Sequence, residues 1–153
     1  PHISHMNLTV ITNSLIVLNS LKNSATVRII MLGGLFNRDE YEVGGIIANN
    51  GLQFIRADYL FMGTSAFDEK SGFVTANPAF ELYVSCIQTA NTICVLTDSS
   101  KYQLGGVNVT AKPQQVHYLF TDAGMPDSAA AQFRKQGINV ICVEEKLKSF
   151  KHA

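Results

Sequence analysis

The 153-residue chain has no excess of either charge: 12 Lys and Arg residues balance 12 Asp and Glu residues, so the formal net charge is zero. Proteins that bind nucleic acid neutralise phosphates with surplus basic residues, so these residues by themselves make a poor nucleic-acid binder. The chain also lacks a polybasic stretch and an apolar run of membrane-spanning length. We therefore expect a domain that contacts neither DNA nor a membrane directly.

Cysteine is scarce, with three scattered residues and no C-x-x-C pair. Cys94 and Cys142 lie inside apolar runs, which predicts buried, reduced thiols rather than a disulfide framework. Reduced thiols are typical of the cytoplasm, so we expect a cytoplasmic protein.

The motifs of several enzyme classes are missing. The sequence contains neither G-x-G-x-x-G nor the G-x-x-x-x-G-K-[ST] phosphate loop, and G-x-S-x-G is also absent. No histidine stands at metal-ligand spacing from Cys, Asp or Glu, and His117 begins an apolar strand, which favours a structural role. Asp68, Glu69 and Glu81 could act in acid–base chemistry, but nothing distinguishes them from solvated carboxylates. We expect no metal, no cofactor and no catalytic residue.

What is present is typical of one compact domain. The hydrophobic share is 46% and the charged share 16%, in a chain whose length suits a single domain. Residues 1–6, PHISHM, look like a cloning remnant, so we expect one domain over residues 7–153, cut from a longer protein.

Short apolar runs alternate with helical patterns along the chain. The runs that predict strands lie at residues 8–11, 27–32, 59–62, 92–96, 116–120 and 138–143. Apolar strands separated by helices indicate an α/β, Rossmann-like fold, with a mostly parallel sheet and helices on both faces. Residues 105–113 show no periodic pattern and are expected to form a surface loop.

Helical spacing and capping residues mark the segments between these strands. Leu15, Leu18 and Leu21 recur at helical spacing behind a potential cap at Asn13 or Ser14. The other signals are a helical face at Ile47, Gly51, Phe54 and Ile55, a helix start at Asn77-Pro78, and a helix from Pro126 to Gly137.

Polar or glycine clusters follow nearly every predicted strand. They are Thr12-Asn13-Ser14, Gly33-Gly34, Gly63-Thr64-Ser65, Asp98-Ser99-Ser100-Lys101 and Thr121-Asp122. In open α/β sheets ligands bind outside the carboxyl ends of the strands, and helix N-termini there favour anions. Lys101 is the only cation in the clusters and a candidate phosphate anchor, with Arg38 as a second candidate. Each cluster also suits ordinary capping and turn formation, and both interpretations stay open.

Seven segments, taken in order, resemble the C-terminal effector-sensing domain of DeoR-family bacterial transcriptional repressors. They are V-I-T-N-S-L (10–15), I-M-L-G-G-L-F (30–36), V-G-G (43–45), A-D-Y-L-F-M-G-T-S (57–65), G-F-V-T-A-N (72–77), D-S-S-K (98–101) and T-D-A-G (121–124). The resemblance implies a fold similar to ribose-5-phosphate isomerase, glucosamine-6-phosphate deaminase and CoA-transferase, and a phosphorylated sugar or related intermediate as effector.

Together, the strand-end pattern and the resemblance predict a set of ligand-binding residues. They are Thr12, Asn13, Gly33, Gly34, Arg38, Gly63, Thr64, Ser65, Glu81, Asp98, Ser100 and Lys101.

The resemblance also implies partners that this sequence does not contain. Operator DNA would be bound through an N-terminal winged helix-turn-helix, and an upstream Asp-Ser-Gly-Thr-Thr loop would complete the pocket; we expect both to be missing here, and the intact protein to be a homo-oligomer. Two alternatives remain: a sugar-phosphate isomerase or deaminase on the same fold, and a pure oligomerisation domain without a ligand.

Overall fold

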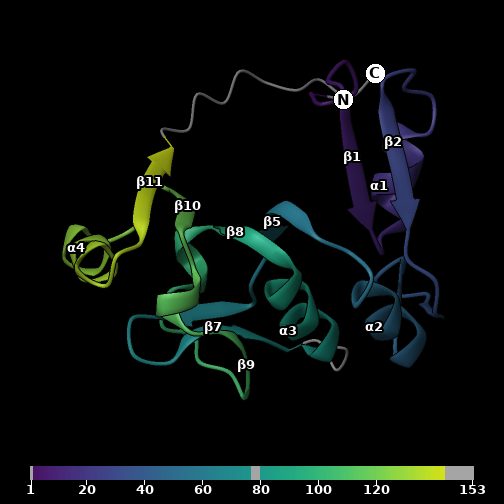
Figure 1. Ribbon diagram of the computed structural model, residues 1–153. Coiled ribbons are helices and arrows are strands. Elements are labelled where there is room, and N and C mark those ends of the chain that lie inside the picture. The colour runs from purple at the N-terminus through teal and green to yellow at the C-terminus, as the bar shows by residue number, and fades with distance from the viewer. Residues whose placement is uncertain (1, 77–79, 144–153) are drawn as a thin grey trace. The chain divides into compact units, whose positions relative to one another are not determined.

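The computed structural model describes residues 2–76 and 80–143. The chain divides into two compact units, Pro1–Ile55 and Arg56–Ala153 (Figure 1). The predicted helix start at Asn77-Pro78 and the residues after 143 lie outside the described residues.

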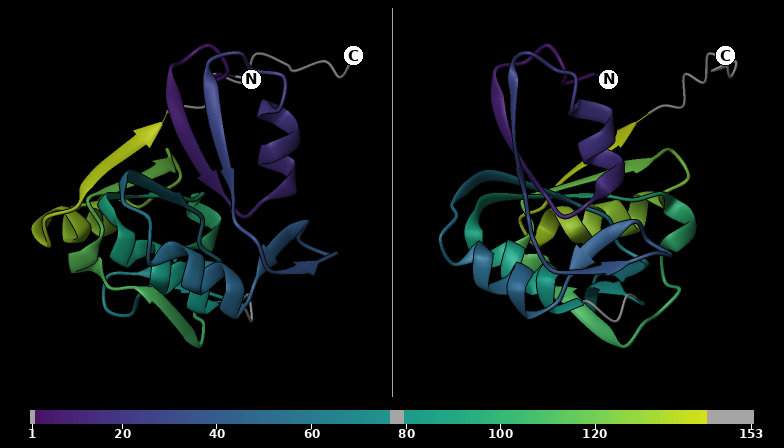
Figure 2. Two further views of the ribbon diagram at one scale, coloured as in Figure 1. Left: turned by 45° about the vertical axis from the view of Figure 1, so that its right-hand side comes forward. Right: turned by 90° about the vertical axis from the view of Figure 1, so that its right-hand side faces the viewer.

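A pair of parallel strands forms the centre of the first unit. Strand β1 (Leu8–Thr12) and strand β2 (Val27–Met31) are joined through helix α1 (Leu15–Leu21), which runs alongside them in both views of Figure 2. Thr12 pairs with Met31, so both strands end side by side. An antiparallel hairpin, β3 (Leu35–Asn37) and β4 (Glu42–Gly44), and helix α2 (Ile46–Leu52) complete the unit.

A four-stranded parallel sheet, in the order β11-β10-β8-β5, forms the centre of the second unit. Its strands are β5 (Ala57–Met62), β8 (Ala90–Leu96), β10 (Tyr118–Asp122) and β11 (Asn139–Val143). Met62 lies opposite Val95, and Leu96 lies opposite Phe120. The α/β class and the mostly parallel sheet are therefore confirmed.

The connections of the second unit add two helices, two short 3-10 turns and an antiparallel sheet of order β6-β7-β9. They are β6 (Ala66–Asp68), β7 (Gly72–Thr75), α3 (Phe80–Thr89), η1 (Ser99–Lys101), β9 (Asn108–Ala111), η2 (Pro113–Gln115) and α4 (Asp127–Lys135). Helix α4 follows Pro126 and ends before Gly137, as the sequence predicted.

One hydrophobic core joins these connections to the sheet. Phe67, Phe73 and Phe133 are almost fully buried, and their ring centroids lie 5.9–6.0 Å apart. Val95 and Leu119 contribute from the two middle strands, and helices α3 and α4 add to the same cluster. The helices of this unit therefore share one face of its sheet, and coverage of the other face stays a prediction.

Two predictions made from hydrophobic periodicity differ from the structure. Residues 105–113 are not simply a loop, because β9 within them pairs with β7 and buries Thr110 and Ala111. Helix α2 buries Ala48 and Leu52, whereas Ile47 and Phe54 are exposed, so the predicted helical face is wrong. Short strands and small buried residues give little hydrophobic periodicity, which explains both errors.

The cysteines are free and differ in their surroundings. Cys94 is buried in β8, as expected. Cys86 is a different case: it is partly exposed, and burial of its thiol raises the pKa to about 11. Cys142 is exposed, so its predicted burial is wrong; it lies near the end of β11, the edge strand of its sheet. No helix among the described residues is long and apolar enough to cross a membrane.

The aromatic core gives the first prediction. Phe133→Ala should lower the free energy of unfolding by about 3–5 kcal/mol, because it removes a buried ring and leaves a cavity beside Phe67 and Phe73. Urea unfolding measures this change. Gln132→Ala, at an exposed position on the same helix, should change stability by less than about 0.5 kcal/mol, and equal effects of the two substitutions would contradict the assignment of this core.

Candidate functional site

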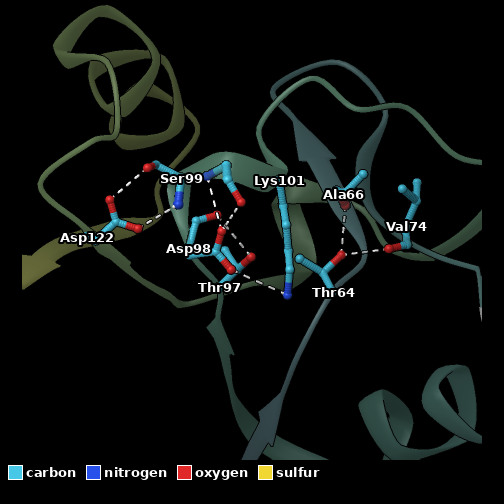
Figure 3. A network of polar contacts seen from close by, with 9 residues as sticks. Thr64, Ala66, Val74, Thr97, Asp98, Ser99, Lys101 and Asp122 are labelled. Carbon is cyan, nitrogen blue, oxygen red and sulfur yellow. Dashed lines mark hydrogen bonds and ion pairs between the residues drawn. The ribbon is translucent and has the colours of Figure 1, made fainter.

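Three of the predicted polar clusters follow neighbouring strands of the four-stranded sheet. Residues 63–65 follow β5, residues 97–101 follow β8, and Thr121-Asp122 ends β10. Because these strands are parallel and adjacent, their carboxyl ends lie at one edge of the sheet, which we term the carboxyl edge. Figure 3 shows the polar contacts made by these residues.

The turn after β8 presents an ion pair at this edge. Asp98 precedes η1 and its carboxylate accepts hydrogen bonds from the Ser100 backbone N–H, at 3.2 Å, and from the Ser100 hydroxyl. The Lys101 Nζ lies 3.5 Å from the second oxygen of this carboxylate, and both side chains are partly exposed. The Ser100 hydroxyl, followed by the Lys101 ammonium, lowers the pKa of Asp98. The Asp98 carboxylate is thus ionised at neutral pH.

The backbone donors of the same turn are already occupied. The N–H of Ser99 donates to Asp122, that of Lys101 to the Asp98 carbonyl, and that of Tyr102 to the Ser99 carbonyl. With the Ser100 N–H also bound to Asp98, the turn offers a ligand its side chains rather than its backbone.

Asp122 fixes the turn from the end of β10. One carboxylate oxygen accepts the Ser99 N–H at 2.7 Å, and the other accepts the Ser99 hydroxyl at 2.7 Å and the Gly124 N–H at 2.8 Å. These bonds lower the pKa of Asp122 to about 2, and the bond from the Ser99 hydroxyl has the largest effect. A Cβ on Gly124 would collide with the Ser99 hydroxyl, so this close approach requires glycine.

The loop after β5 is held by its own polar groups. The buried Thr64 hydroxyl lies 2.7 Å from the carbonyls of both Ala66 and Val74, and the Ser65 hydroxyl accepts the Ala76 N–H at 3.1 Å. Gly63 is exposed beside them. Thr64 therefore has a structural role here. A cavity of about 280 Å³ opens next to Ser65, and its lining does not include Lys101.

In the first unit, the predicted residues meet the β3–β4 hairpin. The Asn13 amide donates to the Glu42 carboxylate and the Val43 carbonyl, both at 3.1 Å, and the Thr12 hydroxyl accepts the Ser14 N–H. Thr12 and Asn13 thus make turn and loop contacts of the kind the capping interpretation expects.

The other three predicted positions of this unit lie in the hairpin or directly before it. Gly34 has φ 144°, and a Cβ there would collide with the Gly44 carbonyl, whereas a Cβ on the neighbouring Gly33 would make only an ordinary contact with Ile47. Arg38 is exposed in the turn between β3 and β4. The backbone approach of Gly34 to Gly44 therefore accounts for one of these two glycines.

The acid–base candidates of the second unit are not gathered around Lys101. The Asp68 carboxylate accepts the Lys70 and Ser71 N–H groups in the β6–β7 turn; although burial alone raises its pKa, these bonds lower it overall. Glu81 is exposed in the first turn of α3. His117 Nδ1 accepts the Ile93 N–H, which agrees with a structural role. Among the described residues, no three His, Cys, Asp or Glu side chains could together hold a metal ion.

Comparison with known proteins assigns the chain to a family. The family model described as the DeoR C-terminal sensor domain matches residues 1–123, which is most of the chain. The chain belongs to the DeoR sensor domain family. The resemblance drawn from the seven sequence segments is confirmed.

Curated relatives of this sensor domain are transcriptional regulators. It is 31% identical to the "Putative aga operon transcriptional repressor" of Escherichia coli O157:H7, over 92% of this chain and 53% of that protein. It is 30% identical to the "Glycerol-3-phosphate regulon repressor" of Escherichia coli K12, over 82% of this chain and 50% of that protein. A third relative, the "L-fucose operon activator" of Haemophilus influenzae, is 24% identical over 78% of this chain and 49% of that protein.

The chain spans about half the length of these relatives. Their names describe regulators, including repressors and an activator, and none describes an enzyme. The prediction of a regulatory rather than a catalytic domain is therefore supported by the family.

The Ser99, Asp122 and Gly124 contacts of the sensor domain were missed as site features. Asp122 was recognised only as the end of a strand-end cluster, and Gly124 only within T-D-A-G. The signal was the Asp-x-Gly spacing, because an aspartate often accepts the N–H two residues later in a turn. The bond to Ser99 had no local signal, since 23 positions separate the two residues.

The low pKa of Asp122 links the stability of the sensor domain to pH. Its folded-state pKa of about 2 lies below the ordinary value of 3.8, so the carboxylate stabilises the fold above about pH 4 and this contribution is lost as the pH falls through 2. Asp122→Asn should be less stable than the wild type at pH 7, and the difference should shrink below pH 4. Urea unfolding across this pH range measures it.

Ser99→Ala is the intermediate variant for that series. It removes the hydroxyl that contributes most to the low pKa of Asp122 but keeps both backbone donors, so the acid dependence should be reduced without being abolished. The difference in free energy of unfolding between the wild type and Asp122→Asn should depend on pH. If it stays constant from neutral to acid pH, the carboxylate does not stabilise the folded state.

Proposed function

We propose that the chain is the effector-binding part of a cytoplasmic DNA-binding regulator of sugar metabolism, and that it binds a phosphorylated sugar or a related intermediate at the carboxyl edge. The observation that carries this proposal is the Asp98–Lys101 pair, a lysine and a carboxylate held together in one turn at the end of β8.

Lys101 suits a phosphate anchor because its present partner is weakly held. An exposed ion pair at 3.5 Å contributes little stability, roughly 0–1 kcal/mol, so a phosphate can take the place of the Asp98 oxygen at low cost. A charge-assisted hydrogen bond from Lys101 to a phosphate dianion would be stronger than the contact it replaces. The Ser100 hydroxyl supplies a second donor in the same turn.

Asp98 favours a phosphorylated sugar over inorganic phosphate. Its ionised carboxylate repels a bare anion but accepts hydrogen bonds from hydroxyl groups. A sugar phosphate carries both features, so its phosphate would meet Lys101 while a hydroxyl meets Asp98. Mixed charge within one turn therefore suits a polyol that bears a phosphate at one end.

The family and its relatives support a regulatory use of this binding. One relative is named for the regulon of a phosphorylated polyol, glycerol 3-phosphate. In the intact regulator, a homo-oligomer would contact operator DNA through a separate domain, and the effector would act by binding one of two arrangements more tightly than the other.

Removal of the lysine side chain tests the binding site. Lys101→Ala should weaken the binding of glycerol 3-phosphate or a hexose phosphate by about tenfold to a hundredfold, the loss expected for one charged hydrogen bond. Calorimetric or NMR titration of the full chain measures this. Lys135→Ala, in the last turn of α4, is the matched control and should bind as the wild type does. Sugar phosphates that bind both variants equally would exclude Lys101 as the anchor.

The regulatory step is tested on the full-length regulator with its operator. A sugar phosphate that binds the sensor should change operator affinity by about fivefold to a hundredfold, and Lys101→Ala should abolish this change. Fluorescence anisotropy with labelled operator DNA measures the affinity. An effector that binds the sensor without altering operator affinity would contradict the regulatory part of the proposal.

A further inference from the structure

The turn that carries Lys101 is held by a residue outside the predicted ligand set. Asp122 lies at the end of β10 and its carboxylate binds three donors from two segments, the Ser99 N–H, the Ser99 hydroxyl and the Gly124 N–H. Figure 3 shows Asp122 on the side of Ser99 away from Lys101. Asp122 is therefore placed to act on the turn without touching a ligand bound by Lys101.

The geometry of η1 carries the effect of this clamp to Lys101. Ser99 and Lys101 are the first and last residues of η1, and the turn is closed by the Tyr102 N–H on the Ser99 carbonyl at 3.0 Å. Because the turn is so short, the orientation of Ser99 determines the direction in which the Lys101 side chain leaves the backbone.

We propose that Asp122 is the positioning residue of the anion site: its bonds to Ser99 hold η1 in the orientation that presents Lys101 to the phosphate of the ligand. This inference rests on the proposed function, since it assumes that Lys101 contacts the phosphate. Asp122, the aspartate of T-D-A-G, would then orient the turn after β8 in addition to accepting the Gly124 N–H of its own turn.

Asp122→Asn is a sharp test because it keeps the size of the side chain. The two backbone N–H groups of Ser99 and Gly124 point at different carboxylate oxygens. An amide has only one oxygen, so in either orientation its NH₂ group faces one of these donors. The substitution thus breaks the clamp at one point with little change in volume.

A double-mutant cycle separates positioning from general stability. Binding of glycerol 3-phosphate is titrated by NMR to the full chain as wild type, Asp122→Asn, Lys101→Ala and the double variant, with the thermal midpoint of each recorded. We expect Asp122→Asn to weaken binding at least about threefold in the wild-type background and by less than about twofold without Lys101, because the two residues act through one turn.

Each result of the cycle has a distinct meaning. If Lys101→Ala binds as tightly as the wild type, the proposed anchor is wrong and the inference falls with it. If Lys101→Ala weakens binding but Asp122→Asn does not, only the inference is overturned. An equal loss in both backgrounds would also overturn it, because that pattern describes a general structural role.

If Asp122→Asn fails to fold, Ser99→Ala takes its place in the double-mutant cycle. It removes one of the three donors and keeps both backbone bonds, so the fold should be retained. It should weaken binding by about twofold, only when Lys101 is present. A loss that is the same with and without Lys101, or no loss at all, would contradict the inference.

Discussion

Strand β8 pairs in parallel with β5 on one side and with β10 on the other, and this pairing determines where the polar residues of the second unit meet. Three neighbouring strands of the sheet end at one edge, so segments that lie far apart in sequence become neighbours. The fully buried Val95 and Leu119 hold the middle strands on the aromatic core. Without this register the turn after β8 would have no fixed partner on β10.

Within that edge, the polar residues divide into groups that hold the loops and groups that remain available. Asp122 and Thr64 are committed to nearby backbone donors or carbonyls, and so are the backbone N–H groups of η1. Lys101 is different, because its only ion-pair partner among the described residues is the exposed Asp98 carboxylate at 3.5 Å. A frame of satisfied hydrogen bonds therefore carries a weakly paired cation, which suits the anion site that we propose.

Much of this could be predicted from the sequence, for reasons specific to each element. Apolar strands such as TICVL and the Pro126–Gly137 helix have strong local signals, and the clusters at their ends follow from the parallel sheet. Strand β9 was missed because its partner β7 is distant in sequence and its residues alternate weakly. The Asp122–Ser99 contact was missed because only the packed sheet brings the two together. At Thr64 the sequence suggested a ligand contact, because its hydroxyl follows a strand. In the structure this hydroxyl instead contacts the backbone carbonyls of Ala66 and Val74.

We propose that a phosphorylated ligand binds at the turn after β8 and leaves the Asp122 contacts of that turn in place. Titration of the ¹⁵N-labelled chain with glycerol 3-phosphate, followed through its amide resonances, tests both parts at once. The account predicts saturable shifts centred on Ser100, Lys101 and residues 63–65, with the Gly124 amide little changed because Asp122 already holds it. Shifts centred on the Asp68–Ser71 turn, or no saturable shift with any sugar phosphate, would contradict it.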